Sequence, residues 1–257
     1  MKVAFLNGIS MSDNVSKYMA AIGVILSKEY NCMVTLGSNY ISNHMLQDCF
    51  SGKIKEEGIA HAPYRFLYGS QEYCNALWSM KRNRQGDILE IPMEGVTIIF
   101  PPDAVEKSMF YYDVPKTSFY LLDVAGENRT VFQNVIEEAD KIVVFLPQDV
   151  TEIHKFFHRF SSLIPKAIVV IEEVQRVNRL FYRKIVAEYG INNKNIGVIP
   201  KNNEFKDACE EGKLEAFLNQ IRATKSPQYN FLSGAKGTAR MIYEQGVQEK
   251  AKESERN

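Results

Sequence analysis

The stretch that decides the fold is residues 141–171, Lys141-Ile-Val-Val-Phe-Leu-Pro-Gln-Asp-Val-Thr-Glu-Ile-His-Lys-Phe-Phe-His-Arg-Phe-Ser-Ser-Leu-Ile-Pro-Lys-Ala-Ile-Val-Val-Ile171. It begins and ends with short β-branched runs, 141–146 and 167–171, which predict two buried strands. Between them, five apolar residues recur at the three- and four-residue spacing of a helix: Ile153, Phe156, Phe157, Phe160 and Leu163. A strand, a helix and a second strand in this order are typical of parallel strands joined by a crossover helix.

The same alternation extends in both directions from this unit. Five further apolar runs predict strands: 2–6, 32–36, 96–100, 119–122 and 196–199. Helical spacing recurs from about Asn14, over 131–139 and over 177–185. Strands that are apolar on both faces suit a parallel sheet covered by helices on either side. We therefore predict one α/β domain over residues 1–247, with a doubly wound, mostly parallel sheet.

Two stretches do not follow this pattern. Residues 37–92 mix aromatic side chains with glycines and predict short helices and loops. Their aromatic residues either pack in the core or form a surface for a partner protein; they are Tyr64, Phe66, Tyr68, Tyr73 and Trp78. Residues 248–257 alternate in charge and predict a frayed tail.

Composition excludes several classes of protein. The chain has 257 residues, of which 45% are hydrophobic, and 31 Lys and Arg balance 31 Asp and Glu. The apolar content excludes low-complexity disorder, and the zero net charge disfavours a polyanion binder that works through bulk charge. We expect no membrane span, no signal peptide and a cytoplasmic location. The 4 cysteines have no CxxC spacing and predict reduced thiols without a disulfide framework or a zinc site.

The loop after the first strand is the most informative candidate site. A phosphate-binding loop needs glycines, a lysine for the phosphate charge and a Ser or Thr for magnesium. Here the loop reads Gly8-Ile-Ser10-Met-Ser12-Asp13-Asn14-Val-Ser16, with one glycine, no lysine and an acidic residue. Its second interpretation is a helix N-cap, in which an internal carboxylate replaces the phosphate. The chain also lacks GxGxxG, which excludes a Rossmann dinucleotide site.

Asp123 is the second candidate. It ends the apolar run Phe-Tyr-Leu-Leu and is followed by Val-Ala-Gly126. A carboxylate in this position either reaches a magnesium ion or hydrogen-bonds to the first loop or a neighbouring helix.

Four segments together resemble the ParA/MinD family of deviant-Walker P-loop ATPases. They are the first strand, loop and helix; 119–126; 138–147; and 198–212. The resemblance implies a SIMIBI-type P-loop fold, a dimer, and ATP with Mg as cofactors. It places the Walker B aspartate and its turn on Asp123 and Gly126, and an adenine-holding segment on 199–212, including Pro200 and Asn202.

Departures from the family pattern imply a pseudo-ATPase. The two loop lysines of the family have no counterpart between Gly8 and Ser16, Lys17 lies too far into the helix, and Gly37-Ser38 replaces the water-orienting aspartate. Atypical members of the TadZ/CpaE type serve as localisation hubs for pilus or secretion machinery, which implies a dimeric assembly scaffold. The alternative is an atypical ATPase in positioning or DNA partitioning. No catalytic residue is assigned, and Asp123 holds Mg only if nucleotide binds; the expected nucleotide-binding residues are Gly8, Ser10, Ser12, Asp13, Asn14, Ser16, Asp123, Gly126, Pro200 and Asn202.

Three arginines at helical spacing, Arg176, Arg179 and Arg183, form the candidate surface for an anionic partner such as DNA. Their second interpretation is a solvated helix face. His154 and His158 have metal-ligand spacing but lack a third ligand in the sequence pattern. The C-terminal segment lacks the apolar face that direct membrane attachment needs.

Overall fold

The computed structural model describes residues 1–8, 14–38, 45–51, 88–90, 96–99, 118–124, 129–174, 179–220 and 227–254. The strands are β1 (Lys2–Asn7), β2 (Val34–Ser38), β3 (Ile88–Glu90), β4 (Val96–Ile99), β5 (Phe119–Val124), β6 (Lys141–Pro147), β7 (Ala167–Val174) and β8 (Ile196–Pro200). The α-helices are α1 (Asn14–Tyr30), α2 (Met45–Ser51), α4 (Arg129–Glu138), α5 (Val150–Arg159), α6 (Arg179–Tyr189), α7 (Asn203–Glu210), α8 (Leu214–Gln220) and α9 (Pro227–Ser254). Two 3-10 helices, η2 (Ser161–Lys166) and η3 (Asn193–Asn195), precede β7 and β8.

The strands form one sheet in the order β3-β4-β2-β5-β1-β6-β7-β8. Among the strands of the described ranges, every pairing from β4 to β8 is parallel, and β3 pairs antiparallel with β4. The predicted doubly wound, mostly parallel sheet is therefore confirmed. Strand β3 corrects the prediction of helices and loops for 37–92, because three residues at a sheet edge are too short to show an alternating pattern.

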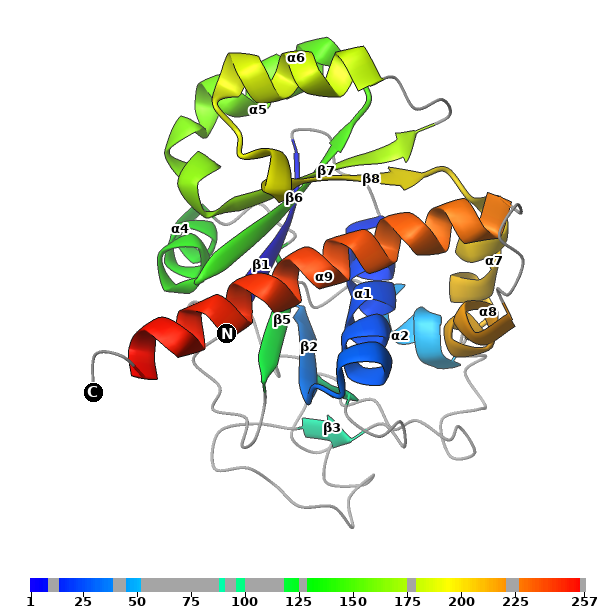
Figure 1. Ribbon diagram of the computed structural model, residues 1–257. Helices are drawn as coiled ribbons and strands as arrows, with labels where there is room; N and C mark the ends of the chain where they lie inside the picture. The colour runs from blue at the N-terminus through cyan, green and yellow to red at the C-terminus, as the bar shows by residue number, and fades with distance from the viewer. Residues whose placement is uncertain are drawn as a thin grey trace.

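Side chains alternate between two apolar cores on the two faces of the sheet. In β1, Val3 and Phe5 belong to the core on the α1 side, whereas Ala4 and Leu6 belong to the core under α4, α5 and α6. Figure 1 shows α1 and α9 on one side of the sheet and α4, α5 and α6 on the other. This three-layer arrangement explains why the central strands are apolar at every position.

Helix α1 is the central helix of its layer. Residues Val15 to Ser27 are all buried, because the helix packs between the sheet and α9. It ends where Asn31 takes a left-handed conformation with φ 51°, and the Cys32 N–H donates to the Leu26 carbonyl at 3.4 Å. This helix-terminating turn delays β2 to Val34, two residues after the predicted start.

Helix α9 runs from Pro227 to Ser254 and crosses the α1 side of the sheet (Figure 1). Its last residues lie within 248–257, for which we expected a frayed tail. Residues 248–254, Gln-Glu-Lys-Ala-Lys-Glu-Ser, are mostly strong helix formers, so the helix continues without an apolar stripe.

The cysteines of the described part are buried thiols without a disulfide: Cys32, Cys49 and Cys209. Cys74 lies outside the described residues. No helix in the described ranges has the length and apolar character needed to cross a membrane.

Candidate functional site

The candidate site lies at the carboxyl ends of the parallel strands, on the α1 side of the sheet. Alternation places Asp123 of β5 on the same face as Phe119 and Leu121, whose side chains pack in the core that contains α1. Ligands of open α/β sheets bind at this edge.

Ser16 and Asp123 form a buried pair. The Ser16 hydroxyl, in the first turn of α1, donates a short hydrogen bond to Oδ2 of Asp123. Both side chains are buried, at 2% and 3% exposure. Burial raises the pKa of Asp123 to about 6, while the hydrogen bond from Ser16 acts in the opposite direction.

Lys17 lies against α7. Its Nζ lies 3.0 Å from Oε1 of Glu210 at the end of α7, and Lys17 is only 5% exposed. The lysine nearest to the loop in sequence therefore ties α1 to α7.

A bulge at the end of β7 directs two glutamates to the same region. Ile171 is opposite Val198 and Val174 is opposite Pro200, so β7 holds one more residue than β8 in this interval. Ile171 and Val174 both pack in the core under α6. Burial, followed by the carboxylates of Glu172 and Glu173, raises the pKa of Tyr18 on α1, and Glu173 itself contacts Asn14 at the start of that helix. An inserted residue of this kind commonly re-aims side chains at functional sites.

Glu173 joins three elements. Its Oε1 accepts a hydrogen bond from Asn14 Nδ2 at 3.3 Å and forms an ion pair with Lys206 of α7. Its backbone is left-handed, with φ 53°, a conformation that is unfavourable for a residue with a Cβ atom. The carboxylate thus lies against the first residue of α1.

Three other expected site residues have structural contacts of their own. The Gly8 N–H donates to the Phe145 carbonyl at 2.9 Å and continues the pairing of β1 with β6. Pro200 ends β8. Asn202 caps α7, because its Oδ1 accepts from the Phe205 N–H at 2.8 Å.

Several expected residues are not placed by the structure. Ser10, Ser12, Asp13, Gly126 and Arg176 lie outside the described residues, as do the aromatic residues between 64 and 78. Arg179 begins α6, and Arg183 is exposed on that helix. His154 contacts the Tyr189 hydroxyl and lies 3.4 Å from Glu188.

The side chains at the candidate site suit the magnesium ion of a magnesium nucleotide better than they suit its triphosphate. The Ser16 hydroxyl and the Asp123 carboxylate are oxygen ligands of the kind that Mg²⁺ prefers. A triphosphate fits less well, because residues 8–16 contain no lysine or arginine and Glu173 already holds Lys206. Among the described residues, no group of three His, Cys, Asp or Glu could hold a metal ion by itself.

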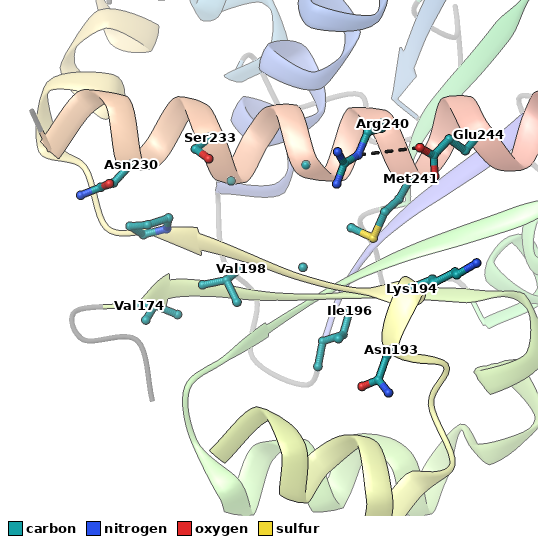
Figure 2. Close-up of a pocket in the computed structure, with 14 residues that line it drawn as sticks. Val174, Asn193, Lys194, Ile196, Val198, Asn230, Ser233, Arg240, Met241 and Glu244 are labelled. Carbon is teal, nitrogen blue, oxygen red and sulfur yellow. Dashed lines mark ion pairs between the residues drawn. The ribbon is translucent and has the colours of Figure 1, made fainter. Parts of the chain in front are cut away.

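A groove of about 790 Å³ lies beside the edge strand β8. Figure 2 shows α9 along one wall, with Asn230, Ser233 and Arg240, and Val198 and Ile196 of β8 along the other. Arg240 and Glu244 form an exposed ion pair at 3.8 Å on the α9 wall. The groove is separate from the Ser16–Asp123 pair in its lining residues.

Sequence reasoning missed Lys206, Glu210 and the contact between Glu173 and Asn14. The only signal was the Glu172-Glu173 pair after an apolar strand, which the bulge turns toward α1. Lys206 and Glu210 lie within α7 and not at a strand end, so their sequence positions carry no comparable signal.

No protein-family model matches the chain, and no curated protein matches it. Solved structures do. A chain of the MinC:MinD cell division protein complex of Aquifex aeolicus is 17% identical, with 95% of this chain and 96% of that chain covered and a TM-score of 0.60.

Two further solved structures agree. A ParA family ATPase from Chlorobium tepidum is 14% identical, with coverage of 93% and 98% and a TM-score of 0.55. A plasmid partition protein from Borrelia burgdorferi bound to AMPPNP is 11% identical, with coverage of 95% and 99% and a TM-score of 0.58. The chain therefore has the P-loop NTPase α/β fold of the MinD and ParA proteins.

Proposed function

We propose that this protein is a catalytically impaired relative of the MinD and ParA ATPases that acts as a dimeric localisation or assembly scaffold in the cytoplasm. Its partner is a protein of a larger machine, such as a pilus or secretion assembly. The observation that carries this proposal is that two lysines near the candidate site are already ion-paired with glutamates. Lys17 is ion-paired with Glu210 and Lys206 with Glu173, and the loop before α1 supplies no other.

Phosphoryl transfer depends on positioning and charge stabilisation, so a site whose described lysines Lys17 and Lys206 are already ion-paired is expected to turn over slowly. The carboxylates of Asp123, Glu172 and Glu173 lie at the same edge of the sheet and disfavour a polyphosphate. A scaffold role needs the fold but not turnover. The Aquifex aeolicus structure is a MinC:MinD complex, which supports the idea that this fold presents surfaces to other proteins.

The test is an ATP hydrolysis assay with the purified chain and Mg²⁺, beside Asp123→Asn and the exposed control Glu244→Gln on α9. We expect all three proteins to show the same background rate. Hydrolysis by the unaltered chain that Asp123→Asn abolishes and Glu244→Gln preserves would contradict the proposal.

The second candidate function is an atypical ATPase that receives its missing cation from a partner. The buried Ser16–Asp123 pair favours it, because a hydroxyl and a carboxylate at this place can hold Mg²⁺ beside a nucleotide. Calorimetry with Mg-ATP distinguishes it: micromolar binding lost in Asp123→Asn supports it, and no binding at millimolar nucleotide excludes it. DNA partitioning through Arg176, Arg179 and Arg183 is tested by triple alanine substitution, which must weaken DNA binding if that surface is used.

A further inference from the structure

The carboxylate of Glu173 contacts two groups that could otherwise bind a phosphate. One oxygen, Oε1, meets both the Lys206 ammonium of α7 and the Asn14 side-chain amide of α1. Lysine ammonium and amide N–H groups bind phosphate oxygens through the same charge-assisted geometry. An external anion must therefore compete with Glu173 for both donors.

The backbone holds Glu173 in this place. The extra residue in β7 puts Ile171 and Val174 on the α6 side and leaves Glu172 and Glu173 between them. At φ 53°, Glu173 occupies a conformation that glycine tolerates better. A glutamate persists there because its contacts with Lys206 and Asn14 offset this unfavourable conformation.

The neighbouring residue Glu172 also disfavours a bound phosphate. Glu172 is buried at 4% exposure, and both glutamates lie close enough to Tyr18 to raise its pKa in addition to burial. Lys17, which could offset them, is held by Glu210, one turn beyond Lys206 on α7. A phosphate approaching Lys206 thus meets the Glu173 carboxylate, with Glu172 next to it in the chain.

We propose that Glu173 is a specificity-determining residue that excludes phosphate-bearing ligands from the carboxyl edge of the sheet by holding Lys206 and Asn14 itself. This inference rests on the proposed function and names the residue responsible for it. Without the Glu173 charge, Lys206 becomes available to a phosphate while the rest of the edge is retained.

The experiment measures the affinity of the full chain for ATP and for inorganic tripolyphosphate by isothermal titration calorimetry. The variants are Glu173→Gln, which removes the charge, and the double variant Glu173→Gln/Lys206→Met, which also removes the cation. The control is Glu152→Gln, which makes the same change in net charge on α5, where Glu152 pairs with Lys155 at 2.9 Å. Glu173→Gly serves as a second variant, because glycine suits the left-handed backbone if Glu173→Gln fails to fold.

We expect Glu173→Gln or Glu173→Gly to bind both ATP and tripolyphosphate about tenfold more tightly than the unaltered chain. The double variant loses this gain, and Glu152→Gln does not show it. A gain of less than about threefold, or a gain that survives Lys206→Met, overturns the inference. Tighter binding of adenosine without its phosphates overturns it as well.

The proposed function is tested separately by the hydrolysis rate of the unaltered chain. Rapid hydrolysis by that chain contradicts the proposed function whatever the variants do. Slow hydrolysis combined with unchanged affinity in Glu173→Gln contradicts only the assignment to Glu173.

Discussion

At the scale of single residues, the Ser16–Asp123 pair shows how burial and hydrogen bonding compete. The carboxylate ends a strand that is buried on both faces, and removal from water disfavours its charged form. The hydroxyl of Ser16 favours the charged form but does not cancel this effect, so the pKa of Asp123 stays raised, at about 6. The Asp123 carboxyl therefore changes its charge about one pH unit below neutral pH.

This shift predicts a pH dependence of stability. Between the ordinary value of 3.8 and about 6, the folded state binds more protons at Asp123 than the unfolded state. The free energy of unfolding therefore falls as pH rises through this window and levels off above it, by about 3 kcal/mol. Asp123→Asn lacks this fall, which urea unfolding of both proteins between pH 4 and pH 7 would measure.

The difference in stability between Asp123→Asn and the unaltered chain isolates Asp123, because the other carboxyl groups titrate in both proteins. It should widen in favour of the variant as pH increases from 4 to 7. A difference that stays constant over this range would show that Asp123 keeps its ordinary pKa.

At the scale of elements, the contact between α9 and the edge strand β8 depends on a glycine. A Cβ atom at Gly234 would lie 2.3 Å from the Val198 carbonyl oxygen and 3.2 Å from the Ile199 Cα. Both are backbone atoms, which cannot move aside as a side chain can. The helix can approach β8 this closely only because Gly234 has no side chain.

Gly234 and Gly237 therefore form a matched pair of substitutions on one helix. Gly234→Ala forces α9 away from β8 and should lower the free energy of unfolding by about 2 kcal/mol. Gly237 has no atom within 4 Å of an added Cβ, so Gly237→Ala should raise stability by about 0.5 to 1 kcal/mol. Thermal or urea unfolding measures both, and equal effects of the same sign would refute the close approach.

At the scale of the whole molecule, the sheet lies between two layers of helices. The outer faces of these helices are the surfaces through which two copies of the chain could associate. The chain has no formal net charge, so long-range repulsion does not oppose self-association. Two-fold dimers are the commonest closed assembly, and a scaffold gains a second copy of each partner surface from one.

We therefore expect sedimentation equilibrium to give twice the mass of the chain, with the same value in the presence of Mg-ATP. The proposed scaffold does not use nucleotide, which is why the mass should not depend on it. A monomer at all protein concentrations would contradict the dimer, and a mass that doubles only with Mg-ATP would favour the active ATPase.

The sequence by itself determined the fold class and most of the strands. Runs such as Ile142 to Leu146 are apolar at every position, and only a sheet covered on both faces buries such a run. The candidate roles of Ser16 and Asp123 were proposed from sequence, since the end of one parallel strand and the start of the helix that follows a neighbouring strand meet at one edge of the sheet. That the two side chains pair with each other is a fact of the structure.

Only the tertiary structure decided which polar and charged side chains meet. Lys17 pairs with Glu210 across 193 positions of sequence separation, and Asn14 meets Glu173 across 159. Such pairings depend on how helices pack and on one inserted residue in β7, and neither leaves a periodic signal in the sequence. Apolar periodicity encodes burial locally, whereas the partner of a charged group is chosen by elements distant in the chain.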